Sequence, residues 1–269
     1  MVKAVIFDWA GTTVDYGCFA PLDVFVEVFK NKGIEITNEE ARAPMGMMKW
    51  DHIKALCKME RINKKWRETF GTIPEDAEVN ELYKDFEPML LEILPNYAEP
   101  IPGTLKLIDT LREQGIKIGS TTGYTSKMME IVAREAKIRG YAPDCLVTSS
   151  DVPAGRPYPY MCYLNAIKLQ VFPLTNIIKV GDTLSDIREG VNANMWSVGV
   201  LKGGSELGLS KEEVENMQPE ELDKLMASTR QRYYEAGAHY VIDTIGDLEN
   251  ILPEIDERSE QGESPSGKK

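Results

Sequence analysis

Three aspartates stand where buried strands of a parallel sheet are expected to end. Asp8 directly follows the apolar run 4–7, and Asp182 follows the run 177–180 after one glycine. Asp186 lies four residues further on, near the start of an expected helix. Short apolar runs are typical of buried parallel strands, and open α/β sheets bind their ligands at the carboxyl ends of such strands. If the two strands are neighbours, the three carboxylates converge.

Converging carboxylates repel one another unless they share a proton or a cation. A cluster of carboxylate oxygens with no His or Cys in reach suits Mg²⁺, which keeps several waters and is bound through one or two carboxylates together with a substrate phosphate. The simpler alternatives are that Asp8 caps a loop and that Asp186 caps its helix. The sequence therefore predicts a magnesium site, with those alternatives open.

A second set of residues suits an anion. Thr122 and Gly123 end the expected strand 116–122, and a strand-end hydroxyl before a glycine offers backbone N–H groups to an oxyanion. Arg156 lies between a glycine and a proline, and its guanidinium binds phosphate-like oxygens in a fork while keeping its charge. A surface position is the alternative for Arg156 taken alone. Together with the carboxylates, these residues predict a site for a phosphoryl group.

Lys49 lies in residues 45–50, an unusually apolar setting for a lysine that contains three methionines and a tryptophan. Desolvation there would lower the pKa of the amine and keep part of it neutral and nucleophilic. His52 follows three residues later on an expected helix, where it is placed to move protons for that amine. A solvent-exposed helix position is the alternative for both side chains.

A long helical segment follows the first strand. One helix face is indicated by apolar residues at helical spacing, namely Leu22, Phe25, Val26 and Phe29. A second helix is expected to begin with a capping box formed by Thr37 and Glu40. Further helices are expected over residues 47–59, 61–70 and 76–93. About eighty residues are too many for a simple crossover between strands. We therefore expect a separate helical cap domain over residues 20–98.

Helices and strands alternate in the rest of the chain, with strands expected near 116–122, 145–147, 177–180, 197–200 and 239–242. This alternation predicts a Rossmann-like, doubly wound α/β core with a mostly parallel sheet and helices on both faces, formed by residues 1–19 and 99–255. Residues 210–236 are expected to form a charged surface helix. The polar end, residues 256–269, is expected to be disordered.

The composition of the chain argues against some kinds of binding partner. The formal net charge of −12 argues against a nucleic-acid backbone or an anionic membrane as the main partner, and no apolar run is long enough to span a membrane. The four cysteines show no metal-type pairing, and Met1 leads directly into the first strand, which leaves no room for a signal peptide. These features predict a cytoplasmic protein with free thiols.

The order of these motifs resembles that of the haloacid dehalogenase superfamily of phosphoryl-transfer enzymes. The resemblance rests on Asp8 with its Gly-Thr turn, Thr122 after a strand, a cation at Arg156, and the block Gly181-Asp182-x-x-x-Asp186. It implies that Asp8 is a nucleophile that forms an aspartyl-phosphate. It also implies that Mg²⁺ is held by Asp8, Asp182 and the backbone carbonyl of Ala10, with Asp186 beside them, and that the helical insert is a cap between the first two motifs.

Ala10 departs from that pattern. Phosphatases of the superfamily usually carry a second aspartate two residues after the nucleophile, which protonates the leaving oxygen. Without it, either the enzyme is impaired or its leaving group needs a different kind of help. A carbon leaving group would need such help, because breaking a P–C bond leaves electrons on carbon that an iminium two atoms away can absorb. That chemistry requires a lysine able to condense with a carbonyl substrate, and Lys49 is the candidate.

A closer resemblance is to the phosphonoacetaldehyde hydrolase family of that superfamily, on residues 8–17, 44–52, 119–124 and 152–159, and it extends from residue 1 to about 255. It implies a Schiff base between Lys49 and phosphonoacetaldehyde, attack of Asp8 on phosphorus, and release of acetaldehyde and phosphate in 2-aminoethylphosphonate degradation. It also implies a homodimer formed through the caps and a pocket lined by Cys18, Met45, Gly46 and Tyr124. The alternatives are a phosphomonoesterase or phosphomutase of the same superfamily, or a non-catalytic phospho-acceptor module.

Overall fold

Strand β1 (Ala4–Phe7) lies in the middle of a six-stranded parallel sheet in the computed structural model, which describes residues 1–268. The strand order is β3-β2-β1-β4-β5-β6, with all neighbouring strands parallel. The other strands are β2 (Lys117–Thr122), β3 (Cys145–Thr148), β4 (Ile177–Gly181), β5 (Trp196–Val200) and β6 (Tyr240–Ile242). The order changes direction at β1, which is where sheets of this type bind ligands. The predicted doubly wound α/β fold is confirmed.

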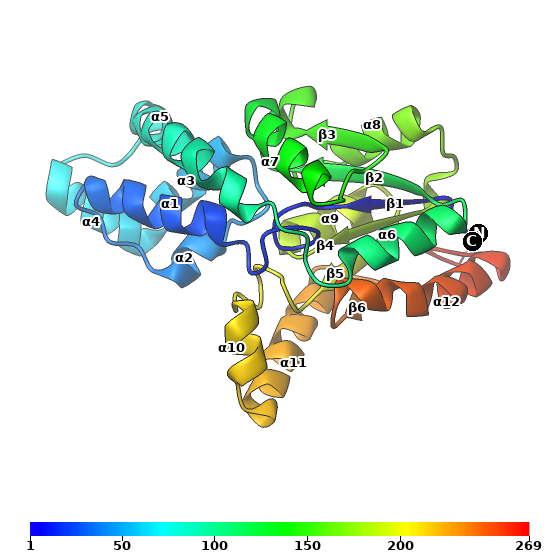
Figure 1. Cartoon of the computed structure of the whole chain (residues 1–269). Helices are drawn as coiled ribbons and strands as arrows, with labels where there is room; N and C mark the ends of the chain where they lie inside the picture. The colour runs from blue at the N-terminus through cyan, green and yellow to red at the C-terminus, as the bar shows by residue number, and fades with distance from the viewer. Residues whose placement is uncertain (269) are drawn as a thin grey trace.

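Helices cover both faces of this sheet, because successive side chains of each buried strand point to opposite faces. Val5 and Phe7 pack in the apolar cluster that includes α6 (Thr104–Glu113), α7 (Ser126–Ile138) and α12 (Leu248–Glu260), on the near face in Figure 1. Ala4 and Ile6 pack with α8 (Tyr160–Leu169) on the other face. Further elements are α9 (Leu184–Asn192), α10 (Lys211–Asn216) and α11 (Pro219–Glu235), and the short 3₁₀ helices η1 (Leu94–Tyr97), η2 (Ser149–Asp151), η3 (Leu174–Asn176) and η4 (Ile245–Asp247).

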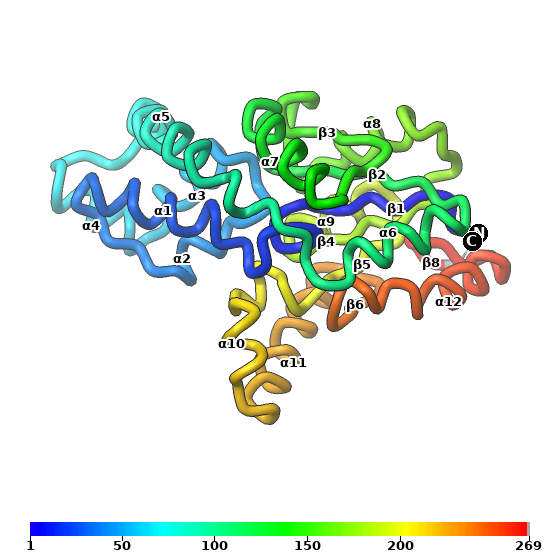
Figure 2. Tube along the Cα trace, in the orientation of Figure 1, coloured from blue at the N-terminus to red at the C-terminus, as the bar shows by residue number. Residues whose placement is uncertain are grey.

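Five consecutive helices stand to one side of the sheet, beyond the carboxyl end of β1 (Figures 1 and 2). They are α1 (Phe19–Asn31), α2 (Asn38–Arg42), α3 (Lys49–Lys58), α4 (Glu60–Phe70) and α5 (Asp76–Ile93). Phe25 of α1 and Phe86 of α5 stack at 4.4 Å between ring centroids inside this group. The predicted capping box at α2 is confirmed, because Thr37 and Glu40 exchange side-chain-to-backbone hydrogen bonds of 3.1 and 2.8 Å.

The chain leaves the sheet for these helices through a tight linker. Asp15, Gly17 and Cys18 all have positive φ angles of 55°, 87° and 53°. The Asp15 carboxylate accepts hydrogen bonds of 3.1 Å from the backbone N–H groups of Phe19 and Ala20. These are N–H groups of the first turn of α1, which have no partner within the helix. Burial raises the pKa of Asp15 to about 7, even though these two bonds act in the opposite direction. The linker therefore holds a fixed turn between the sheet and α1.

Residues 210–236 differ from the single surface helix expected for them. The chain breaks at Met217 and Gln218, and Pro219 then occupies the first turn of α11, where its missing N–H costs nothing. Tyr233 of α11 is fully buried, and its hydroxyl donates a hydrogen bond of 2.6 Å to the backbone carbonyl of Asp182. The inner face of α11 therefore supports the loop that carries a site aspartate.

The predicted disorder of residues 256–269 is wrong for the part of this segment that the structure describes. Helix α12 continues to Glu260, and β7 (Glu263–Ser264) pairs with β8 (Gly267–Lys268) in an antiparallel hairpin. Arg258 explains the order, because its guanidinium stacks over the rings of Trp196 and Tyr240 and donates a 2.8 Å hydrogen bond to Glu263. Cation–π contacts of this kind hold a polar segment on the domain without an apolar core of its own.

Candidate active site

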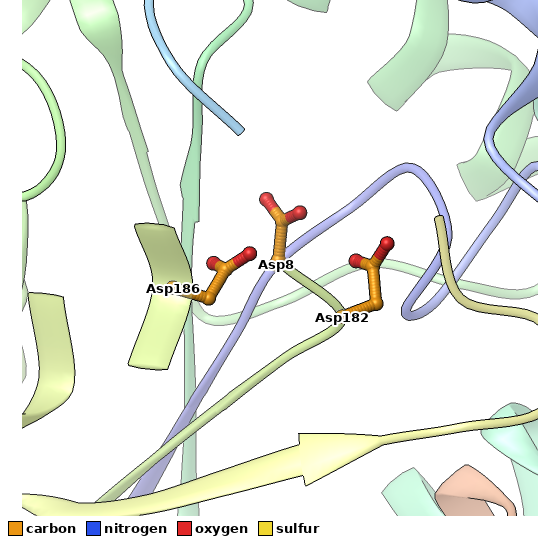
Figure 3. Close-up of side chains that lie close together, drawn as sticks. All are labelled: Asp8, Asp182 and Asp186. Carbon is orange, nitrogen blue, oxygen red and sulfur yellow. The ribbon is translucent and has the colours of Figure 1, made fainter. Parts of the chain in front are cut away.

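Asp8, Asp182 and Asp186 meet at the carboxyl end of the sheet (Figure 3). Phe7 pairs with Val180 across β1 and β4, so the aspartates that follow the two strands emerge side by side. All three side chains are buried, and one carboxylate oxygen of each lies within 4.8 Å of the others. The condition set for convergence is therefore met, because the two strands are neighbours, and the three aspartates are close enough to bind one metal ion.

The three carboxylates differ in their hydrogen-bond partners. Asp182 accepts bonds of 2.6 Å from the Thr12 hydroxyl and 2.8 Å from the Ser205 N–H. Burial, reinforced by the charges of Asp8 and Asp186, still raises the pKa of Asp182 well above its usual range. A positive charge beside Asp182 would therefore stabilise its ionised form.

Asp186 is already neutralised by protein cations. Its Oδ1 atom lies 2.6 Å from Lys179 Nζ and 3.1 Å from Arg156 Nη2, and its Oδ2 accepts a 2.6 Å bond from the Thr183 hydroxyl. Burial opposes the ionisation of Asp186, but Arg156 and Lys179 keep its pKa below the ordinary value. The simple helix-cap alternative for Asp186 is wrong, because Thr183 is the residue that caps α9.

The balance of buried charge suits a divalent ion. Four buried carboxylates surround the site, namely Asp8, Asp182, Asp186 and Glu189, against the two buried cations Arg156 and Lys179. When all four carboxylates are ionised and Lys49 is neutral, two negative charges remain unbalanced. Buried charges are costly unless they are paired, and an all-oxygen cluster is the ligand set that Mg²⁺ or a similar hard ion prefers. The residues present therefore fit a divalent cation held between Asp8 and Asp182.

Arg156 is buried rather than at the surface, which excludes the simpler alternative for it. Its Nη2 atom donates a 2.7 Å hydrogen bond to Asp8 Oδ1. Burial alone would lower the pKa of Arg156, but Asp186, Asp8 and Glu189 hold it well above the ordinary value. A permanent positive charge therefore lies directly against the expected nucleophile, where a phosphoryl group would need it.

Lys49 is also buried, which excludes a solvent-exposed position for this amine. It is the first residue of α3, and its Nζ atom lies 4.9 Å from the ring centroid of Tyr124 and 5.7 Å from that of Phe25. Among the described residues, no hydrogen-bond or ion-pair partner meets this nitrogen. Burial is the largest cause and lowers the pKa of Lys49. The nearby Cys18 and Asp8 oppose this shift without reversing it. The amine is therefore shifted towards the neutral form that can attack a carbonyl group.

His52 does not join the other predicted residues at the site. Its ring stacks on Phe25 at 3.8 Å between centroids, and its Nε2 atom lies 2.8 Å from the carbonyl oxygen of Ala41. Because a carbonyl can only accept, Nε2 carries the proton, and Nδ1 has no partner within the described chain. Burial, reinforced by Lys49, lowers the pKa of His52 well below its usual value. His52 is therefore a neutral residue of the helical insert, and its surface alternative is wrong as well.

A cavity of only about 20 Å³ lies between the helical insert and the end of the sheet. It is lined by Asp8, Ala10, Cys18, Met45, Gly46, Lys49, Thr122, Gly123, Tyr124, Arg156 and Thr183. Thr183 is the one lining residue that the sequence analysis missed, although it lies two residues after the end of β4 and directly follows Asp182. A space of this size holds about one water molecule, so the lining has to open to admit a substrate.

Close backbone contacts bring the insert against the sheet. A Cβ atom added at Gly123 would lie 2.5 Å from the carbonyl oxygen of Met47. Gly155 donates its N–H to the Met48 sulfur at 3.2 Å, and a Cβ atom there would lie 2.5 Å from the Met48 side chain. Glycine at these positions lets the loop before α3 approach closely enough to carry Lys49 into the cavity.

Comparisons with known proteins agree with this geometry. A family model for haloacid dehalogenase-like hydrolases matches residues 2–194. Proteins named phosphonoacetaldehyde hydrolase from Bacillus mycoides and Bacillus cytotoxicus are 57% and 58% identical over 257 residues, which cover 96% of this chain and 97% of theirs. A crystal structure of a phosphonoacetaldehyde hydrolase-like protein from Oleispira antarctica superposes with a TM-score of 0.96 at 41% identity, covering 98% of this chain and 96% of that one.

One further relative has a different architecture. A bifunctional phosphonoacetaldehyde hydrolase/aminoethylphosphonate transaminase from Clostridioides difficile is 58% identical over 255 residues, which cover 95% of this chain and 40% of that protein.

Within residues 1–268, no helix has the length and apolar character needed to cross a membrane.

A Gly123→Ala substitution tests the close contact that holds the insert in place. The added Cβ atom would overlap the carbonyl oxygen of Met47, so the loop before α3 should move away and expose Lys49. We expect hydrogen exchange of the amides of residues 45–50 to become at least about tenfold faster. Gly246→Ala is the matched control, because its Cβ atom would meet only ordinary contacts. Equal exchange in the two variants would contradict the contact.

Proposed function

The chain belongs to the phosphonoacetaldehyde hydrolases within the haloacid dehalogenase-like hydrolase family, and on that premise we propose that it cleaves the carbon–phosphorus bond of phosphonoacetaldehyde to give acetaldehyde and phosphate. The observation that carries this proposal is a buried lysine amine in the same small cavity as Asp8, where Ala10 stands in place of an acid. An ordinary phosphatase would need that acid and has no use for the amine.

The first step is formation of a Schiff base. The neutral amine of Lys49 attacks the aldehyde carbon, and loss of water gives a protonated imine. Burial supports this role because it disfavours the charged ammonium form of Lys49. Tyr124 and Cys18 line the same cavity and enclose the two-carbon part of the substrate. Burial raises the pKa of the Cys18 thiol well above the ordinary value, so this thiol stays neutral and does not compete as a nucleophile.

The second step transfers the phosphoryl group. A carboxylate oxygen of Asp8 attacks phosphorus, the carbon–phosphorus bond breaks, and its electron pair moves onto the iminium to give an enamine. The products of this step are an aspartyl-phosphate and an enamine bound to Lys49. Arg156, Thr122 and Gly123 surround the cavity and would bind the phosphoryl oxygens. No acid at position 10 is needed, because the leaving electrons are taken up by nitrogen rather than by an oxygen.

Water completes the cycle. One water molecule hydrolyses the aspartyl-phosphate and releases phosphate and free Asp8. The enamine takes up a proton at carbon, and a second water hydrolyses the resulting imine to acetaldehyde and free Lys49. Since imine formation released one water, the net reaction consumes one. We also propose that His52, three residues from Lys49 on α3, acts as a proton carrier for this amine, because its Nδ1 atom has no hydrogen-bond partner in the described chain.

We propose that the divalent ion is Mg²⁺, held by Asp8, Asp182 and the carbonyl oxygen of Ala10. Asp186 lies beside these ligands and pairs with Arg156 and Lys179. The support is the all-oxygen donor set and the two unbalanced negative charges described above. When bound, such an ion screens the negative charges of Asp8 and an incoming phosphoryl group from each other. The proposal does not need any other cofactor.

We further propose that residues 20–98 act as a cap domain over the core formed by residues 1–19 and 99–255. The small size of the cavity supports this, because substrate must enter while the two parts are apart. Closure would then bring Lys49 to a phosphonate already held at Asp8 and exclude water from the imine. A homodimer formed through the caps and a cytoplasmic location are proposals that rest on the family resemblance and on the sequence, respectively.

Replacement of Lys49 by Arg tests the Schiff-base role. Arginine keeps the positive charge but does not form an imine, so release of acetaldehyde and phosphate from phosphonoacetaldehyde should fall at least about a thousandfold in kcat. Lys54→Arg is the matched control, because Lys54 lies on the same helix and pairs with Asp76 outside the cavity. Turnover of the Lys49 variant within about tenfold of the unmodified enzyme would refute the imine.

The metal proposal is tested by thermal unfolding. A saturating Mg²⁺ concentration, about a hundred times its Kd, should stabilise the protein by about 2.7 kcal/mol and raise the midpoint by roughly 5–10 °C. In Asp182→Asn the rise should vanish, because one of the two anionic ligands is gone. Asp109→Asn, at an exposed position of α6, should keep the full rise. A Mg²⁺-dependent rise that survives in the Asp182 variant would contradict this assignment.

A further inference from the structure

Glu189 of α9 is a fully buried acid that the proposed mechanism leaves without a role. Among the described residues, the polar contacts of its side chain are made through one carboxylate oxygen. Oε2 accepts hydrogen bonds of 2.9 Å from Arg156 Nε and 3.1 Å from the Thr121 hydroxyl, and it lies 3.6 Å from Lys179 Nζ. The other oxygen, Oε1, has no hydrogen-bond partner in the described chain. A buried carboxylate with one unsatisfied oxygen is costly, so its presence at this position calls for a physical explanation.

The contacts of Glu189 form a closed ring with Arg156. Arg156 Nε donates to Glu189 Oε2, Thr121 Oγ1 donates to the same oxygen, and Arg156 Nη2 donates back to Thr121 Oγ1 at 2.8 Å. A guanidinium group is planar, so bonds to two of its nitrogens fix both its position and the orientation of its plane. The ring therefore leaves Arg156 a single orientation.

In that orientation, each of the three guanidinium nitrogens has a different partner. Nε is bound by Glu189, and Nη2 donates the 2.7 Å bond to Asp8 Oδ1. Within residues 1–268, the one contact of Nη1 is a long one of 3.4 Å, to the carbonyl oxygen of Gly46 in the loop before α3. Because Arg156 lines the cavity, Nη1 is the donor left for an oxygen of a bound anion. Loss of the Glu189 contact would free the plane to rotate.

Rotation of the guanidinium plane would allow Asp186 to take Arg156 away from Asp8. Its Oδ1 atom lies 3.1 Å from Arg156 Nη2 and competes with Asp8 for the same nitrogen. Lys179 reduces this competition, because its ammonium group binds the same oxygen more closely, at 2.6 Å. Lys179 and Glu189 thus have complementary effects on Arg156. One satisfies the competing carboxylate, and the other holds the guanidinium in place.

We propose that Glu189 is a positioning residue that fixes the plane of Arg156, so that Nη2 holds Asp8 while Nη1 faces the phosphoryl oxygens. This inference rests on the proposed function only in that Arg156 binds a phosphoryl group. Partners that orient a binding residue from behind commonly contribute ten- to a hundredfold to affinity or activity at metal sites, and an effect of about tenfold is expected here.

The experiment measures binding of inorganic phosphate to the full-length protein in saturating Mg²⁺ by titration calorimetry. Glu189→Gln is the main variant, because it keeps the shape of the side chain while removing the charge that holds Nε. We expect its Kd for phosphate to rise about tenfold. Glu135→Gln is the matched control: Glu135 also pairs with an arginine, Arg139, but lies on α7 outside the site, so the Kd should not change.

The same substitution in an Arg156→Ala background separates positioning from other effects. If Glu189 acts only through Arg156, Glu189→Gln should change the phosphate Kd of that background by less than about twofold. An Arg156→Lys background, which keeps a charge but has no guanidinium plane, gives a second cycle with the same expectation should the Ala background bind phosphate too weakly. A tenfold loss in either background, or no loss with Arg156 present, would overturn the proposal.

Thr121→Val provides a second variant should Glu189→Gln fail to fold, as judged by thermal unfolding. Valine keeps the volume of threonine but opens the ring at its hydroxyl, and a loss of about threefold that vanishes without Arg156 is expected. An unchanged Kd in this variant would also count against the ring. Phosphate binding involves no carbon–phosphorus cleavage, so failure of the proposed function would appear separately, as absence of acetaldehyde release by the unmodified enzyme.

Discussion

An excess of buried negative charge at the carboxyl end of the sheet is the constraint on which the rest of this structure depends. Parallel pairing of β1 with β4 brings Asp8 and Asp182 together, and α9 adds Asp186 and Glu189. Such a cluster is tolerated only where cations share it. Arg156 and Lys179 supply two positive charges, and the remaining imbalance matches one divalent ion. The same ion and the same arginine would then receive the negative charge of a phosphoryl group.

A small difference in sequence changes the chemistry available on this common scaffold. Ala10 removes the acid that would protonate an oxygen leaving group, and Lys49 introduces an amine that can withdraw electrons from a carbon leaving group. Both residues line the cavity, one from the core and one from the helical insert. Glycines at positions 123 and 155 allow the contact that brings them together. Catalysis would therefore depend on how the insert seats against the core.

The sequence predicted most of the fold because its signals are local. The apolar strands, the capping box at Thr37 and the boundaries of α5 agree with the structure, and β1 and β4 are the neighbours that the convergence of Asp8 with Asp182 required. The ordered end of the chain could not be predicted, since it depends on Arg258 stacking on rings from β5 and β6. Glu189 was missed for a similar reason. A glutamate is usually exposed, and no neighbouring residue in the sequence indicates that this one pairs with a buried arginine 33 positions away.

The Schiff base is the central claim, and chemical trapping tests it most directly. The full-length enzyme with Mg²⁺ would be mixed with phosphonoacetaldehyde and sodium borohydride, which reduces an imine to a stable amine, and the modified peptide would be identified by mass spectrometry. The mechanism predicts substrate-dependent inactivation with a two-carbon or phosphonate-bearing adduct on Lys49. Labelling of another residue, or continued turnover with no label at Lys49, would contradict it.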